Sequence, residues 1–212
     1  MTKQRFYISL LLYAAMWSVW SVWMIRLSPM GGGSVWAALL EALLAKPFVW
    51  ILPPALLLWR DRGAFRSLFA SSFPWIPCFV ALCLTVAFLY TLRLVNGLQG
   101  TYAVFDPMFL AFSLSAGVVE ELSFRGCFFL LHKESLGLWA AAALNGVLFT
   151  LYHYPGLLFG LSWGALLSLR ALLLFVMGAV FCFLFWRWRN LALTMTVHTV
   201  WNLLSYLFCL AG

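Results

Sequence analysis

The chain has 212 residues, of which 65% are hydrophobic and only 9% are charged. Soluble domains carry about 25% charged residues, so a water-soluble fold is excluded, and the mean hydropathy of +0.99 indicates an integral membrane protein in contact with lipid. The net charge of +7 does not indicate a nucleic-acid partner, because the basic residues are scattered at the ends of apolar runs.

Seven apolar runs predict the membrane spans, since a helix needs about 20 mostly apolar residues to cross a bilayer. The second run is interrupted by Lys46-Pro47 and Pro53-Pro54, which predicts a kinked span or an interfacial helix followed by a short crossing. Lys46 is expected to extend its ammonium group to an interface. The predicted fold is all-α, a polytopic bundle of about seven transmembrane helices, with spans at 6–25, 38–59, 75–92, 107–131, 137–153, 166–186 and 190–210.

The basic residues predict the orientation of the bundle, because cytoplasmic loops are enriched in Lys and Arg. If the seven spans alternate, Arg26 and Arg93 fall on one side. The other side holds Lys3, Arg5, Arg60, Arg62, Arg66, Lys133, Arg187 and Arg189. That side is therefore expected to be cytoplasmic, and it includes the N-terminus. The first span is expected to be retained, in the inner membrane of a prokaryotic cell.

The fourth run contains the most unusual stretch, Glu120-Glu121-Leu-Ser-Phe-Arg125. Each such charge at the centre of a membrane helix costs about 2.5–3.5 kcal/mol on insertion scales. In a helix, Glu121 and Arg125 share one face and can pair, while Glu120 is rotated by about 100° from its neighbour. A structural ion pair explains Glu121 and Arg125 but gives Glu120 no role, which favours a functional site.

Two later runs carry further polar groups. Run five places Asn145, Phe149 and His153 at intervals of four residues, and run seven places His198 and Asn202 at the same interval. A histidine and an asparagine on one helical face can both donate hydrogen bonds to one point. The alternatives are an interfacial histidine in run five and an interhelical hydrogen-bond pair in run seven.

Other polar residues are not expected to belong to a site. His132 lies beside Lys133 and Glu134, which predicts a solvated turn. Asp106 precedes Pro107 and is expected to be a helix N-cap.

Two carboxylates, two histidines and an amide suit either hydrolysis or metal binding. Glu120 is placed to accept a proton from water as a general base, and His153 could hold the same water. His198 and Asn202 could donate hydrogen bonds to a developing oxyanion. The metalloprotease pattern HExxH is absent.

The three motifs together resemble the CAAX protease and bacteriocin-processing (CPBP, or Abi) family, whose pattern is EExxxR, then FxxxH, then HxxxN. The resemblance divides the chain into N-terminal helices at 1–106 and a catalytic core at 107–212. In this sequence the motifs are Glu120-Glu121 with Arg125, Phe149 with His153, and His198 with Asn202.

The resemblance implies a helical intramembrane endopeptidase of the glutamate type. Glu120 would activate water with His153, and His198 and Asn202 would stabilise the oxyanion. Glu121 and Arg125 would orient these groups. No cofactor is implied; two histidines and a glutamate could in principle bind zinc, but zinc is not favoured.

Two functional classes remain open. The first is a peptidase that cuts a membrane-associated peptide or protein: a prenylated CAAX tail, a bacteriocin leader, or a C-terminal sorting tail as in myxosortase-like proteins. The second is a non-enzymatic membrane immunity factor or a bundle that handles ions or protons. The small size and the Arg- and Trp-rich spans favour a prokaryote, where prenylated substrates are less expected. The sequence leaves the oligomeric state open.

Overall fold

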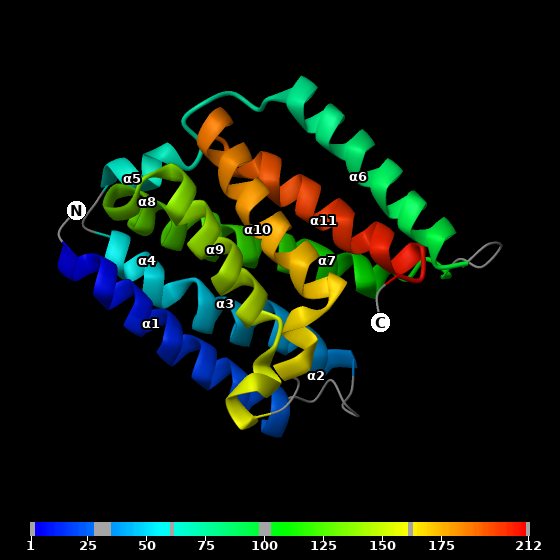
Figure 1. Ribbon diagram of the computed structural model, residues 1–212, viewed down its shortest axis with the longest axis horizontal. Helices are drawn as coiled ribbons and strands as arrows, with labels where there is room; N and C mark the ends of the chain where they lie inside the picture. Colours follow the sequence, from blue (N-terminus) through cyan, green and yellow to red (C-terminus); the bar gives the residue numbers. More distant parts are fainter. Residues whose placement is uncertain (1–2, 28–34, 60–61, 98–102, 161–162, 211–212) are drawn as a thin grey trace.

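Helices make up nearly all of the computed structural model, which describes residues 3–27, 35–59, 62–97, 103–160 and 163–210 (Figure 1). The predicted all-α fold is confirmed. Within it, η1, η3 and η4 are π-helical and η5 and η6 are 3-10 turns. In chain order the elements are α1 (Lys3–Val22), η1 (Trp23–Leu27), α2 (Val35–Leu40), η3 (Glu41–Ala45), α3 (Lys46–Trp50), α4 (Leu52–Leu58), α5 (Arg62–Ser67), α6 (Trp75–Val95), α7 (Pro107–Glu121), η4 (Leu122–Phe129), α8 (Leu130–Leu136), α9 (Leu138–Tyr152), η5 (Pro155–Phe159), η6 (Trp163–Leu167), α10 (Leu169–Trp188) and α11 (Leu191–Leu207).

Each of the seven expected runs is helical, but the helices differ in length. Among the described residues, the stretches long and apolar enough to cross a membrane are Gln4–Arg26, Glu41–Leu58, Trp75–Val95 and Leu169–Trp188. Helix α9 has 15 residues and α11 has 17, and α7 continues without a break through η4 into α8. The second run is divided into η3, α3 and α4, with prolines in the first turns of α3 and α4, where their missing N–H is tolerated.

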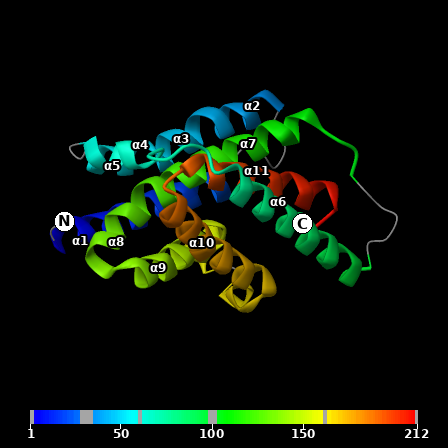
Figure 2. The ribbon, with the colours of Figure 1, turned by 90° about the horizontal axis from the view of Figure 1, so that it is seen from above.

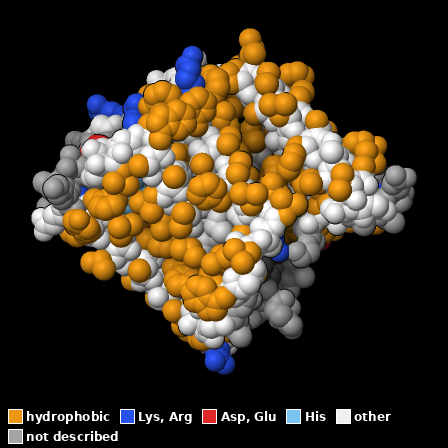
Figure 3. Space-filling model, in the orientation of Figure 1, with side chains coloured by type: hydrophobic (Ala, Val, Ile, Leu, Met, Phe, Trp, Pro, Cys, Tyr) orange, Lys and Arg blue, Asp and Glu red, His pale blue; other side chains and the backbone are white. Residues whose placement is uncertain are grey.

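The surface agrees with a membrane location. Hydrophobic side chains cover much of the face seen in Figure 3, while most of the visible Lys and Arg side chains lie toward its margins. Large apolar side chains such as Leu11, Ile76 and Phe79 are mostly exposed, which lipid explains and water does not. The predicted orientation stays a prediction, and Arg60, one of the basic residues behind it, lies outside the described residues.

The continuous α7–η4–α8 stretch is surrounded by the other helices (Figures 1 and 2). Helix α11 packs on α7 and on α6, α10 packs on α9, and α1 packs on α3, α4 and α8. An aromatic cluster that includes Tyr13, Trp50, Phe124 and Tyr152 joins α1, α3, η4 and α9. The carboxylates of Glu120 and Glu121 and the guanidinium of Arg125 are therefore directed into the interior of the bundle, whereas Glu134 near the end of the stretch is exposed.

Glycines permit two close helix crossings, as small residues commonly do between membrane helices. A Cβ on Gly117 of α7 would lie 3.0 Å from the backbone oxygen of Met195 on α11. A Cβ on Gly146 of α9 would lie 2.7 Å from the backbone oxygen of Phe175 on α10. These contacts bring α9 and α11, which carry the two histidine motifs, close to the rest of the core.

We expect Gly146→Ala to destabilise the protein. The new Cβ would collide with the backbone of α10, and overpacking of this kind typically costs about 1–3 kcal/mol, more than the helix propensity gained by replacing glycine. The control is Gly164→Ala, because a Cβ at that position meets nothing within 4 Å. Unfolding of the two variants in mixed detergent micelles should separate them; equal stability would show that α9 and α10 do not cross so closely.

Candidate active site

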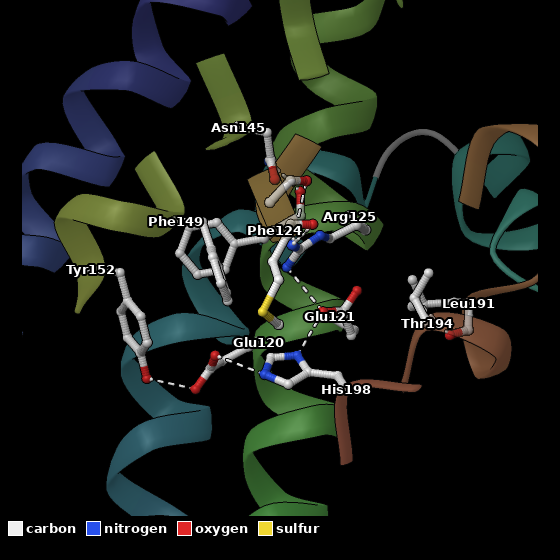
Figure 4. A network of polar contacts seen from close by, with 12 residues as sticks. Glu120, Glu121, Phe124, Arg125, Asn145, Phe149, Tyr152, Leu191, Thr194 and His198 are labelled. Carbon is white, nitrogen blue, oxygen red and sulfur yellow. Dashed lines mark hydrogen bonds and ion pairs between the residues drawn. The ribbon is translucent and has the colours of Figure 1, made fainter. Parts of the chain in front are cut away.

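Glu120 and Glu121 lie at the end of α7, where the chain changes to the wider π-helical winding of η4. Single π turns within helices often occur at functional sites. Both carboxylates are buried, with 5% of Glu120 and none of Glu121 exposed. They point in different directions, as the helical spacing predicts, and the ring of His198 lies between them (Figure 4).

Glu121 holds two partners through one oxygen. Its Oε1 lies 2.9 Å from Nη1 of Arg125 and 2.8 Å from Nδ1 of His198. The predicted pairing of Glu121 with Arg125 is thus confirmed. The guanidinium of Arg125 is fully buried. Its Cζ lies 4.5 Å from the centre of the Phe149 ring and 5.3 Å from the centre of the Phe181 ring. Arg125 therefore ties the central stretch to α9 and α10 as well as to Glu121.

Glu120 is the point where four helical segments meet. Its Oε1 accepts hydrogen bonds from Nζ of Lys46 at 2.6 Å and from the hydroxyl of Tyr152 at 3.2 Å. Its Oε2 lies 3.9 Å from Nε2 of His153 and 3.6 Å from Nε2 of His198. Glu120, His153 and His198, one residue from each of the three motifs, thus converge at this carboxylate.

The two histidine rings are oriented through their other nitrogen. Nδ1 of His153 lies 2.9 Å from the backbone oxygen of Phe149, and because a carbonyl only accepts, this nitrogen carries the hydrogen. Nδ1 of His198 faces the carboxylate of Glu121 in the same way. Both rings consequently present Nε2 to Glu120. The Phe149 ring fills the space beside them, with its centre 4.7 Å from the His153 ring and 5.8 Å from the His198 ring.

Charge is balanced locally. The carboxylates of Glu120 and Glu121 face the cations of Lys46 and Arg125. Removing charges from water is expensive, and an unpaired buried charge is strongly destabilising. The pairing therefore makes two adjacent carboxylates tolerable inside the bundle.

Asn202 lies one turn beyond His198 and lines a cavity of about 570 Å³, together with His153. The walls come from α6, α7, α10 and α11 and are mostly apolar, including Leu89, Phe109, Phe112, Leu173, Met177 and Trp201. The cavity thus reaches the polar centre from the side of these four helices.

Two predictions about individual residues are wrong. Lys46 does not extend to an interface: its side chain is 14% exposed and pairs with Glu120, because α3 packs against α7. His132 is not solvated: it is fully buried, and its Nε2 lies 2.9 Å from Oγ of Ser9, because α1 covers α8. The predicted N-cap is confirmed, since Oδ1 of Asp106 accepts from the backbone nitrogen of Met108 at 2.8 Å.

Lys46 and Tyr152 are the contacts to Glu120 that sequence reasoning missed. Lys46 carried a signal, since a lone cation inside an apolar run is by default a functional candidate. Tyr152 carried none, because buried tyrosines usually serve packing. Among the described residues, the side chain of Asn145 bonds to neither glutamate. Its Nδ2 donates to the backbone oxygen of Phe124 at 2.8 Å and so links α9 to η4.

Glu120, His153 and His198 are the residues that would supply ligands to a metal ion. Within the described parts of the chain, no group of three or more His, Cys, Asp or Glu side chains is arranged to hold one. The Lys46 ammonium group bonded to Glu120 also disfavours a second cation at this carboxylate. The predicted absence of a cofactor stays a prediction.

Fold and site define a polytopic helical membrane protein with a buried carboxylate–histidine centre. Residues 102–204 match the family model described as Rce1-like, type II CAAX prenyl endopeptidase Rce1-like, and the match includes all three motifs. Over these residues the chain is similar to this family, which supports the CAAX-protease group that the motifs predict and, in general, an intramembrane endopeptidase of the CAAX-protease type. Comparisons with curated proteins and with solved structures give no match.

We expect Arg125→Ala to destabilise the protein by about 3–5 kcal/mol, because it leaves Glu121 buried without its cation. Unfolding in mixed micelles measures the loss. Arg187→Ala is the control, since Arg187 is exposed near the end of α10. Wild-type stability of Arg125→Ala would mean that Glu121 does not depend on this pair.

Proposed function

We propose that the protein is a glutamate-type intramembrane endopeptidase in which Glu120 activates the attacking water. The observation that carries this proposal is the convergence on Oε2 of Glu120, where Nε2 of His153 lies at 3.9 Å and Nε2 of His198 at 3.6 Å. These gaps exceed direct hydrogen-bond lengths, and they suit a water molecule that bridges the carboxylate and a ring nitrogen.

In the proposed reaction, Glu120 takes a proton from the water while the water oxygen attacks the carbonyl carbon of the scissile peptide bond. His153, whose Nε2 faces the same carboxylate oxygen, holds the water in line. Collapse of the tetrahedral intermediate breaks the C–N bond, and Glu120 returns the proton to the leaving nitrogen. One group thus serves as base and then as acid.

His198 and Asn202 are assigned to the oxyanion. The carboxylate of Glu121, 2.8 Å from Nδ1 of His198, holds the ring with Nε2 turned toward Glu120, and a ring with a hydrogen on Nε2 would donate it to the oxyanion. Asn202 follows one turn later on α11 and lines the neighbouring cavity, where its amide would donate to the same oxygen. Preorganised donors of this kind typically contribute about 10²–10³ in rate each.

The cavity beside His153 and Asn202 supports a substrate that presents an apolar segment. Its walls are mostly aliphatic and aromatic, and sites of this kind bury apolar groups with a few polar side chains fixing the orientation. The proposed substrate is a membrane-associated precursor or C-terminal tail, cut next to its apolar part. The proposed setting is a prokaryotic inner membrane with the N-terminus in the cytoplasm.

We expect Glu120→Gln to lose cleavage by about 10²–10⁴-fold, because an amide accepts no proton from water. The purified protein would be reconstituted in vesicles with two fluorogenic peptides, each with an apolar tail and one prenylated at a CAAX cysteine. The control is Glu134→Gln, which removes a carboxylate from α8 outside the site.

The proposal fails if Glu120→Gln or His198→Ala cleaves like the wild type. Proton flux through the vesicles that stops on Glu120→Gln, with neither probe cut, would support the non-enzymatic alternative instead. Preference between the two probes separates a prenylated from an unprenylated substrate.

Cleavage is also expected to survive removal of divalent metals. Lys46 already neutralises Glu120 at 2.6 Å, so the reaction proposed here needs no second cation. Dialysis against a chelator, followed by elemental analysis and the peptide assay, measures this. Loss of cleavage that returns on adding Zn²⁺ would contradict a metal-free reaction.

A further inference from the structure

Lys46 reaches the centre from the part of the chain that the family match does not include. The match begins at residue 102, whereas Lys46 is the first residue of α3. Its Nζ lies 2.6 Å from Oε1 of Glu120, and the two side chains are only 14% and 6% exposed. The carboxylate of Glu120, which forms this short contact, is the general base in the proposed function.

The two oxygens of Glu120 have different surroundings. Oε1 accepts from both Lys46 and Tyr152. Oε2 is buried and accepts no hydrogen bond from the described residues, although the Nε2 atoms of His153 and His198 face it. A carboxylate held through one oxygen leaves the other oxygen in a fixed direction. Oε1 is therefore the anchored atom and Oε2 the atom available for reaction.

The backbone around Lys46 is built to hold this contact. The π-helical η3 ends directly before Lys46, whose N–H donates to the carbonyl of Glu41. Pro47 has no N–H to offer to the preceding turn. The carbonyl of Ala42 instead accepts from Oγ of Ser115 at 2.6 Å. Ser115 lies on α7, five residues before Glu120, so this bond ties the Lys46 turn to the helix that carries the carboxylate.

Side-chain packing fixes the same turn from the other direction. Trp50, four residues after Lys46 on α3, is almost fully buried and packs edge-to-face on Tyr152 with ring centres 4.8 Å apart. Nζ of Lys46 lies 5.6 Å from the centre of the same Tyr152 ring. At the start of η3, Nε1 of Trp23 donates to Oε2 of Glu41 at 3.0 Å. The position of the ammonium group is consequently set by contacts of the backbone around Lys46 and of the side chains beside it.

We infer that Lys46 is a positioning residue of the peptidase site: with Tyr152 it anchors Oε1 of Glu120, so that Oε2 faces the two histidines in its ionised, proton-accepting form. This inference rests on the proposed function, because it assumes that Glu120 is the base. It assigns to the N-terminal helices a direct part in the chemistry of the core.

The test compares Lys46→Met, Lys46→Gln and Lys46→Arg in the full-length protein, reconstituted and assayed with the fluorogenic peptide that the wild type cleaves. Lys133→Met, at a lysine on α8 outside the site, is the matched control. Each variant is first checked for wild-type size-exclusion behaviour and melting. Lys46→Gln keeps a hydrogen-bond donor but removes the charge, so its kinetics and pH profile are used if Lys46→Met does not fold.

We expect Lys46→Met to lower kcat by about 10–100-fold with KM changed less than about threefold, since the substrate cavity is untouched and only the base is misplaced. The acid limb of its pH profile should move to higher pH, because removing a nearby cation makes a carboxylate harder to ionise. Lys46→Arg should recover most of kcat, and Lys133→Met should match the wild type. A merely structural lysine would leave the pH profile of the folded fraction unchanged.

Folded Lys46→Met or Lys46→Gln with wild-type kcat and pH profile would overturn the inference, and so would a rise in kcat, which would make Lys46 a restraint on the base. If Glu120→Gln is inactive in the same assay, only the role of Lys46 is lost. If Glu120→Gln cleaves normally, the proposed function itself is wrong, whatever Lys46 does.

Discussion

Two carboxylates buried side by side set the main constraint on this structure. A charge inside a bilayer is tolerated when it faces the protein interior and meets an opposite charge, and Glu120 and Glu121 meet that condition with different partners. Arg125 pairs with Glu121 within the same helical stretch. Lys46 pairs with Glu120 from another helix. The first pair depends only on local winding, whereas the second requires α3 to lie against α7.

The arrangement of the other helices agrees with this constraint. Helix α9 contributes its last residue, Tyr152, and its C-cap, His153, and α11 contributes His198 from its middle. Glycines at the α7–α11 and α9–α10 crossings permit the close approach that these contacts need. Polar groups are thereby concentrated in one place, while the surface of the bundle remains largely apolar (Figure 3).

The sequence predicted the parts of the site that depend on local spacing. Glu121 and Arg125 are four residues apart, and so are His198 and Asn202, so periodicity alone indicates which side chains share a face. The three motifs in series also predicted the family, which the match over residues 102–204 confirms. The helical fold followed from composition and the apolar runs, although within the described residues only some of the predicted runs form helices long and apolar enough to span a bilayer alone.

The misplaced residues are those whose environment depends on packing between distant helices. Lys46 is separated from Glu120 by 74 positions and His132 from Ser9 by 123. Periodicity within one helix says nothing about which neighbouring helix covers a given face. A lysine followed by proline in a broken apolar run is therefore as compatible with a membrane interface as with the buried pair that Lys46 forms. Only the packing of α3 against α7 distinguishes these two environments.

The contact between Lys46 and Glu120 also bears on how the two halves of the chain are related. The family match includes Glu120, both histidines and the arginine, but Oε1 of Glu120 takes its shortest contact from outside that region. Without it, Glu120 would lose the cation bonded to it, and losing a nearby opposite charge disfavours the ionised form of a carboxyl group. A protonated carboxyl group cannot act as a general base. The N-terminal helices therefore supply the charge that the core needs for its proposed chemistry, in addition to packing around it.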